Sequence, residues 1–169
     1  MLKQLDRRSL TIRAFEPNDL AVLQSIRKAA FAPVFESFRS IAGEQIAALA
    51  FTHADAEQAK LLDDICAPQS GHRVFVVCDD GESVGFVSIT TDSTTRTGEI
   101  GLNAVHPKHA GRGIGAWMYE YVLAQMKELG MLLAVVGTGG DSSHAPARRA
   151  YEKVGFGPTI PSVYLYKLL

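Results

Sequence analysis

Three closely spaced glycines lie in the segment Gly111-Arg112-Gly113-Ile114-Gly115-Ala116. The segment follows a short extended run, Glu99 to Val105, and precedes about fifteen residues of helical periodicity. Backbone N–H groups at a helix N-terminus bind anions, and glycines let a backbone approach a ligand closely because they carry no Cβ. The spacing therefore predicts a ligand that carries phosphate groups.

Two commoner phosphate motifs fit this segment poorly. A P-loop needs Lys followed by Ser or Thr after its second glycine, and neither residue is present. A dinucleotide fingerprint needs an acidic residue at a strand end about twenty positions further on, whereas Glu128 falls within the expected helix. An isolated glycine cluster also occurs as a plain surface turn, but the strand before it and the helix after it favour the phosphate site.

A second motif runs from His144 to Phe156. Pro146 suits the first turn of a short helix, and Gly155 suits a left-handed helix end. The inward stripe of this helix consists of Ala147, Ala150, Tyr151 and Val154. Phe156 is expected to pack back on its last turn.

Both segments resemble the GCN5-related N-acetyltransferases. Val105-His106-Pro107 and Gly113-Ile114-Gly115 resemble the pyrophosphate loop of that family, and residues 147–156 resemble its later Tyr-Glu-Lys-x-Gly-Phe segment. Two positions depart from the pattern: Ala110 replaces a Gln or Arg, and His144 replaces an Asn. The resemblance implies transfer of an acetyl group from acetyl-coenzyme A to a primary amine, by direct attack in a ternary complex.

The resemblance also implies where the coenzyme binds. The backbone near Ala104 is expected to bulge and pair with the pantetheine, while the amides after Ala110 receive the pyrophosphate and Arg112 adds charge. His144 is expected either to contact the coenzyme or to cap the following helix. The coenzyme-binding residues implied are Asn103, Ala104, Val105, Gly111, Arg112, Gly113, Ile114, Gly115, Ala116 and His144.

Attack by an amine on a thioester calls for a base and an acid, because a free alkylamine has a pKa near 10.4 and the leaving thiolate departs more easily when protonated. Strand alternation groups Glu99 with Gly101 and Asn103, opposite the apolar Ile100, Leu102 and Ala104. Glu99 is the candidate base; a solvent-facing Glu, or attack without a dedicated protein base, stays open. The resemblance implies that Tyr151 donates its proton to the sulfur, although a lone Tyr is also a common core residue.

Local patterns and the resemblance together predict the fold class: α/β (α+β), a mixed and mostly antiparallel sheet with helices on both faces and a splayed strand pair that holds the coenzyme. Residues 1–169 are expected to form a single acetyltransferase domain. A helix is expected from Pro17 to about Pro33. The other helices are expected at Glu44 to Ala50, Asp55 to Ile65 and Ile114 to Leu129, and the strands at Leu10 to Ala14, Arg73 to Cys78, Ser83 to Thr90, Glu99 to Val105, Leu132 to Val136 and Tyr164 to Leu168.

Composition limits the partners. The net charge is −1 and no basic block occurs, so nucleic acid is not an expected partner. The two cysteines and five histidines show no metal-ligand spacing, so we expect no metal. No run of about eighteen apolar residues occurs, and Met1 to Arg8 lacks an apolar stretch behind its charges, so we expect a cytoplasmic protein that does not enter membranes.

Three questions stay open at the level of sequence. The amine acceptor is not identified by any motif. A non-catalytic coenzyme A sensor or interaction domain, and a transferase of longer acyl groups, remain alternatives on the same fold. Residues Val163 to Tyr166 are apolar and extended in pattern, and could pair across a homodimer.

Overall fold

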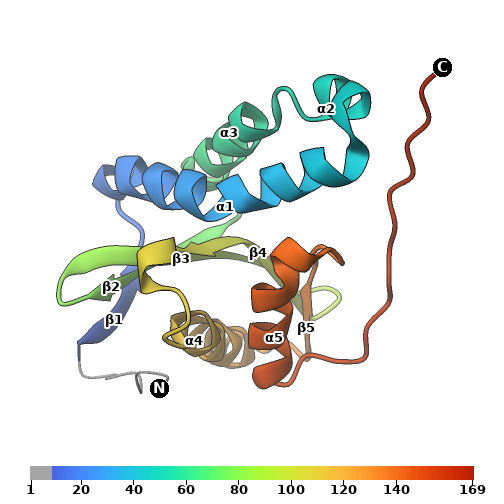
Figure 1. Ribbon diagram of the computed structural model, residues 1–169. Coiled ribbons are helices and arrows are strands. Elements are labelled where there is room, and N and C mark those ends of the chain that lie inside the picture. Colours follow the sequence, from blue (N-terminus) through green and yellow to red (C-terminus); the bar gives the residue numbers. More distant parts are fainter. Residues whose placement is uncertain (1–8) are drawn as a thin grey trace.

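The computed structural model describes residues 9–169, so the expectation for Met1 to Arg8 lies outside it. Five strands form one sheet in the order β1-β2-β3-β4-β5 (Figure 1). The first four run antiparallel to their neighbours, whereas β4 and β5 are parallel. The strands are β1 Leu10–Ala14, β2 Arg73–Asp79, β3 Glu82–Asp92, β4 Thr97–Val105 and β5 Leu133–Val136. The predicted mixed, mostly antiparallel sheet is confirmed.

Helices cover both faces of the sheet. In Figure 1, α1, α2 and α3 lie above it, α4 lies below, and α5 stands beside the end that carries β5. The helices are α1 Leu20–Ala42, α2 Glu44–Ala50, α3 Ala54–Cys66, α4 Ile114–Glu128 and α5 Ala145–Lys153, with short 3-10 turns at Pro17–Asp19, Pro107–His109 and Ser142–His144. The expected bounds of α2, α3 and α4 agree with these to within about a residue.

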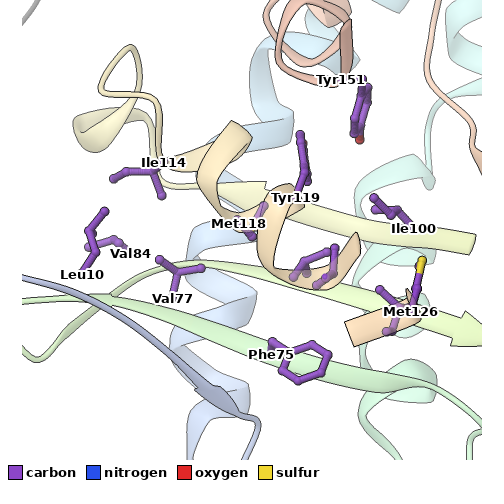
Figure 2. Packing of buried hydrophobic residues seen from close by; sticks show 13 residues of the cluster. Leu10, Phe75, Val77, Val84, Ile100, Ile114, Met118, Tyr119, Met126 and Tyr151 are labelled. Carbon is purple, nitrogen blue, oxygen red and sulfur yellow. The ribbon is translucent and has the colours of Figure 1, made fainter. Parts of the chain in front are cut away.

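Each face of the sheet has its own apolar cluster. Leu23 and Ile26 of α1 pack with Leu62 of α3 against Val76 and Phe86. On the other face, side chains of α4 and α5 pack against β2, β3 and β4, as Figure 2 shows. The labelled members of this second cluster are Leu10, Phe75, Val77, Val84, Ile100, Ile114, Met118, Tyr119, Met126 and Tyr151.

Pro33 does not end α1, contrary to the expectation from sequence, and the helix continues to Ala42. A proline inside a helix removes one hydrogen bond and costs about 3 kcal/mol. Val34 and Phe35, directly after it, are buried, and burying two such side chains gains about 1.5–3 kcal/mol each. Tertiary burial therefore outweighs the local preference, and the extra turns bring Ser37 and Phe38 toward the loop after β5.

The predicted last strand, Tyr164 to Leu168, is also wrong for this chain. Residues 156–169 form no ladder with any strand in the described part of the chain, and Val163, Tyr164 and Leu165 are exposed. Figure 1 shows this segment as an extended arm that runs up the side of the molecule toward α2. A strand pattern alone does not make a strand, because its backbone groups need a neighbouring strand to bond.

Candidate functional site

The strands β4 and β5 separate halfway along β4. Their pairing covers Thr97 to Ile100 against Leu133 to Val136 and then stops. Within residues 9–169, no strand bonds to the β5-facing edge of β4 beyond Ile100. The chain therefore holds open a strand edge whose backbone groups are available to an extended, amide-bearing ligand.

A bulge on β4 begins where this separation begins. Val87 of β3 pairs with Asn103 and Ile89 pairs with Ile100, so two residues of β4, Gly101 and Leu102, oppose the single Ser88. The hydroxyl of Ser88 donates to the carbonyl of Leu102 over 3.0 Å. A Cβ on Gly101 would lie 2.8 Å from that hydroxyl oxygen, so glycine is needed here. The resemblance implied a bulge near Ala104. The bulge lies at Gly101 and Leu102, two to three residues before Ala104.

The bulge changes which side chains share a face. Ile100 packs in the apolar cluster on the face covered by α4, which we call the α4 cluster. Leu102 and Ala104 pack in the cluster on the face covered by α1, the α1 cluster. The prediction that these three residues share one face is therefore wrong. One extra residue shifts the alternation of a strand by one. Asn103 consequently points toward α4 and α5, whereas Glu99, next to Ile100, lies on the opposite face.

Asn103 joins two tyrosines beside the opening between β4 and β5. Its Nδ2 donates to the carbonyl of Gly101 over 2.9 Å and to the Oη of Tyr151 over 3.1 Å. Its Oδ1 accepts from the Oη of Tyr119 over 2.8 Å. The two tyrosine rings are stacked with centroids 4.5 Å apart, and Figure 2 shows both in the α4 cluster.

These contacts fix where the Tyr151 proton can go. A carbonyl only accepts hydrogen bonds, so the bond to Gly101 identifies the nitrogen of the Asn103 amide. The second hydrogen of that nitrogen points to Tyr151 Oη, which therefore accepts from Asn103. The hydrogen of the Tyr151 hydroxyl is left to donate to another group.

Tyr119 is a site residue that the sequence did not single out. Burial, together with neighbouring Tyr151, raises the pKa of Tyr119 well above its ordinary value, so Tyr119 stays protonated and keeps donating to Asn103. The sequence spacing could have identified Tyr119 as buried, because it stands three residues before Val122 and seven before Met126, and both of those residues are buried. The buried arc of α4 is wider than the single stripe that the spacing suggested.

The glycine turn leads into α4 as the sequence predicts. Gly111 and Gly113 have φ angles of 75° and 84°, in the left-handed region that favours glycine. Gly113 is the N-cap of α4 and is exposed. The first amides of the helix, from Gly113 to Ala116, lack intrahelical partners, so their hydrogens are unused within the helix.

Arg112 does not extend freely from this turn. Its Nη1 donates to Asp79 Oδ2 over 2.6 Å and lies 3.0 Å from Nδ1 of His109. Hydrogen bonds from Ser9 and then from Arg112 hold the pKa of Asp79 below its usual value. The ion pair holds the glycine turn against the end of β2. It stabilises the turn where Ala110, in place of the usual Gln or Arg, has no polar side chain to do so.

His144 is the N-cap residue of α5, but its side chain makes no capping hydrogen bond, so the capping alternative is wrong. Its Nδ1 lies 2.6 Å from Asp141 Oδ1, and its ring stacks on Phe38 of α1 with centroids 5.8 Å apart. Ser37 of α1 donates to the other Asp141 oxygen over 2.9 Å. A residue of α1 and one after β5 thus meet across the open end of the sheet.

The structure brings some of the expected residues together and not others. Asn103 and Tyr151 bond to each other, and Gly111 to Ala116 form one continuous turn and helix start. Ala104 and Val105 lie along the second half of β4. Glu99 is exposed and lies on the other face of the sheet from Tyr151.

The described residues contain neither a cluster of three or more metal-ligating side chains nor a helix long and apolar enough to cross a membrane. The site offers an open strand edge, a helix N-terminus and an oriented tyrosine hydroxyl. The first two fit a long ligand with amides at one end and phosphates at the other.

Known proteins were compared with this chain by sequence and by structure. A family model described as "Acetyltransferase (GNAT) family" matches residues 36–156. Among curated protein sequences none matches significantly.

Solved structures share the fold at low identity. A GNAT-family acetyltransferase from Brucella melitensis in complex with acetyl-CoA is 22% identical, with a TM-score of 0.60 over 90% of this chain and 91% of that one. The ribosomal-protein-S18-alanine N-acetyltransferase from Escherichia coli is 17% identical, with a TM-score of 0.63 over 89% and 79%. The aminoglycoside N-acetyltransferase AAC(6')-Iy, in complex with CoA, is 16% identical, with a TM-score of 0.63 over 94% of both chains. The family model covers most of the chain, and this chain therefore belongs to the GNAT family as an acetyltransferase that uses acetyl-CoA.

Proposed function

We propose that this chain transfers the acetyl group of acetyl-CoA to a primary amine by direct attack in a ternary complex. The observation that carries the proposal is the loss of β5 pairing after Ile100, in the stretch of β4 where Asn103 bonds to the hydroxyl of Tyr151. The pantetheine pairs with the freed edge of Asn103, Ala104 and Val105. Residues 1–169 act in this proposal as one acetyltransferase domain, supported by the single sheet with a core on each face.

The diphosphate of the coenzyme occupies the N-terminus of α4. Its negative charge is held by the backbone amides of Gly111 to Ala116, including Ile114 and Gly115, and by the positive end of the helix dipole. The charge of Arg112 is already opposed by Asp79. Arg112 therefore supports the turn more than it neutralises phosphate.

Tyr151 acts as the acid. When the amine nitrogen attacks the carbonyl carbon, a C–N bond forms and the C–S bond breaks with its electron pair on sulfur. The thiolate then takes the proton of the Tyr151 hydroxyl, which Asn103 leaves free to point at the sulfur. The amine loses its proton either to Glu99, which lies on the other face of β4, or without a dedicated protein base.

Removal of one hydroxyl tests this function. Tyr151→Phe is expected to fold and to bind acetyl-CoA like wild type in calorimetry, while kcat falls about 100-fold or more, the range for loss of a general acid. Tyr121→Phe is the matched control, because Tyr121 packs edge-on against Phe75 away from Asn103, and it should keep the wild-type rate. An unchanged kcat in Tyr151→Phe with an acceptor in hand would remove Tyr151 from the mechanism. An acyl-chain series separates an acetyltransferase from a transferase of longer groups.

The acceptor class does not follow from the fold. The E. coli relative is named for an alanine of a ribosomal protein, and another relative is named for aminoglycosides. The acceptor is therefore proposed only as a primary amine. A panel with peptide N-termini, lysine side chains and small polyamines tests it.

A homodimer is the partner that we propose besides the substrates. The arm of residues 156–169 exposes Val163 and Leu165, and the edge strand β5 exposes Leu133 and Val135. An unpaired strand pattern and an unpaired sheet edge complement each other between two copies. Leu165→Asp should lower the mass in light scattering from dimer to monomer, with Lys167→Asp as the control; a monomeric wild type refutes the pairing. A cytoplasmic location is also proposed, supported by two cysteines that stay unpaired.

A further inference from the structure

The loop between β5 and α5 contains a histidine and an aspartate in hydrogen-bond contact. Nδ1 of His144 and Oδ1 of Asp141 are 2.6 Å apart. A carboxylate accepts but does not donate, so Nδ1 of His144 carries a proton, and in the neutral imidazole the lone pair is then on Nε2. A Cβ on Gly139 would lie 2.7 Å from Cε1 of His144 and 2.8 Å from Asp141 Oδ1, so any larger residue there would push the two side chains out of this arrangement.

Asp141 is held by groups other than the histidine. Oδ2 accepts from Ser37 of α1 over 2.9 Å and from the backbone N–H of Ser143 over 3.1 Å, and the Ser143 hydroxyl also contacts it. Burial alone raises the pKa of Asp141. The hydrogen bonds from Ser143, His144 and Ser37 lower this pKa by more than burial raises it, so the pKa of Asp141 lies well below its usual value. The carboxylate stays charged and keeps the imidazole in one orientation.

The second ring nitrogen of His144 is open to a ligand. In the described part of the chain, Nε2 makes no hydrogen bond, and the one buried unpaired side-chain nitrogen or oxygen is Nδ1 of His72. The ring itself is fixed by stacking on Phe38. The result is an oriented imidazole with an accessible lone pair.

His144 is the N-cap residue of α5, and Tyr151 lies within that helix. They are seven residues apart, which is about two helical turns and about 10 Å along the axis. Tyr151 lies at the separation of β4 and β5, and His144 lies where α1 crosses the loop after β5. A thioester bound at this separation would have the Tyr151 hydroxyl beside it, and the His144 imidazole would lie toward α1.

We infer that His144, oriented by Asp141, is the general base that removes the proton from the acceptor amine. This inference rests on the proposed function. Nε2 accepts one proton from the attacking nitrogen, directly or through one water, as the C–N bond forms. The sulfur receives a proton from Tyr151, and the imidazolium then returns its proton through solvent to the Tyr151 phenolate, so that protons and charge balance over the cycle. Asp141 is a positioning residue.

Few other charges face this imidazole. On α1, Glu36 and Arg39 are exposed and lie 3.8 Å apart as a pair. On α5, Nη1 of Arg148 donates to the backbone carbonyls of Gly139 and Asp141 and holds the loop. Asp141 is therefore the charged group in direct contact with this imidazole.

The test is His144→Asn, because an Asn side chain can still donate to Asp141 while it lacks Nε2. We expect kcat to fall about 100-fold or more, as for loss of a general base, with the Kd for acetyl-CoA within about two-fold of wild type by calorimetry. The wild-type kcat/KM should decrease toward low pH as the base is protonated, and this limb should vanish in His144→Asn. His53→Asn is the matched control, because His53 is exposed, stands at the N-cap position of α3 and, like His144, makes no capping hydrogen bond with its side chain. Added imidazole should restore activity to His144→Ala.

Separate readouts distinguish the two failures. If His144→Asn binds acetyl-CoA, keeps kcat within about three-fold and retains the acid limb, the inference is overturned while the proposed function stands. If wild type acetylates none of the amines, the proposed function and this inference fall together. Nitrogen NMR of His144 adds a readout without turnover: a proton on Nε2 in place of Nδ1 overturns the inference.

Discussion

The binding of coenzyme phosphates at α4 can be tested by a pair of substitutions that differ only in charge. Gly113 is the N-cap of α4 with φ at 84°. Any side chain there meets the left-handed backbone, which costs about 1–2 kcal/mol. Gly113→Asp and Gly113→Asn share that cost and have nearly the same shape, so a difference between them isolates the negative charge.

The magnitude follows from Coulomb's law. Two like unit charges about 6 Å apart, at an effective dielectric of about 20, repel by about 3 kcal/mol. This energy corresponds to a factor of about 100 in Kd. Because Gly113 is exposed, salt screens part of this repulsion. We therefore expect coenzyme A to bind Gly113→Asp about 10- to 100-fold more weakly than Gly113→Asn at low ionic strength.

Isothermal calorimetry with coenzyme A measures both variants at low salt and again at about 0.3 M salt, where the Debye length is about 6 Å. The ratio of the two dissociation constants should shrink at high salt, since the effect is electrostatic. Circular dichroism checks that both variants are folded. Equal affinities at low salt would show that the diphosphate lies elsewhere, and the anion site at α4 would have to be abandoned.

Three further results are expected. Gly101→Ala should destabilise the fold by about 1–3 kcal/mol in urea titrations, because the new Cβ would lie 2.8 Å from Ser88 Oγ. The control Gly137→Ala, where nothing lies within 4 Å of the new Cβ, should be close to neutral. Equal stabilities of the two variants would contradict the close packing of Gly101 against Ser88 at the bulge. The pKa of Asp79 is lowered in the folded state by Ser9 and Arg112, so its stabilisation is present above its unfolded pKa of about 3.9 and is lost as pH falls through the lower folded value. Urea midpoints between pH 6 and about pH 3 should accordingly depend less on pH in Asp79→Asn than in wild type, and parallel curves would argue against this ion pair. Burial raises the pKa of Cys66 to about 11, so alkylation of this thiol by iodoacetamide should be slow at neutral pH and accelerate as the pH approaches that value; rapid labelling at neutral pH would contradict its burial.

Local periodicity predicted most elements of the fold. The helix α4 and the short helix α5 are encoded within a few residues each, and Gly155, just after α5, adopts the expected positive φ of 95°. The glycine turn before α4 is equally local. Such features depend on neighbouring side chains and on backbone conformations that glycine permits.

The interior of the site depended on contacts between distant residues. The bulge that turns Asn103 toward Tyr151 needs Ser88 on the neighbouring strand, and alternation along β4 alone placed Asn103 on the wrong face. Tyr119 entered the site because α4 is buried over a wider arc than one stripe. Neither fact can be read from the segment in which the residue stands.

The sequence by itself determined the glycine turn before α4, most of the helices and strands, and the family to which the chain belongs, because each is written in short segments with a local physical cause. Only the tertiary structure decided that α1 passes Pro33, that the arm of residues 156–169 has no strand partner, and that Ser37 meets Asp141 across 104 positions. These outcomes are set by burial and by hydrogen bonds between segments far apart in the chain, whose free energy exceeds local preference.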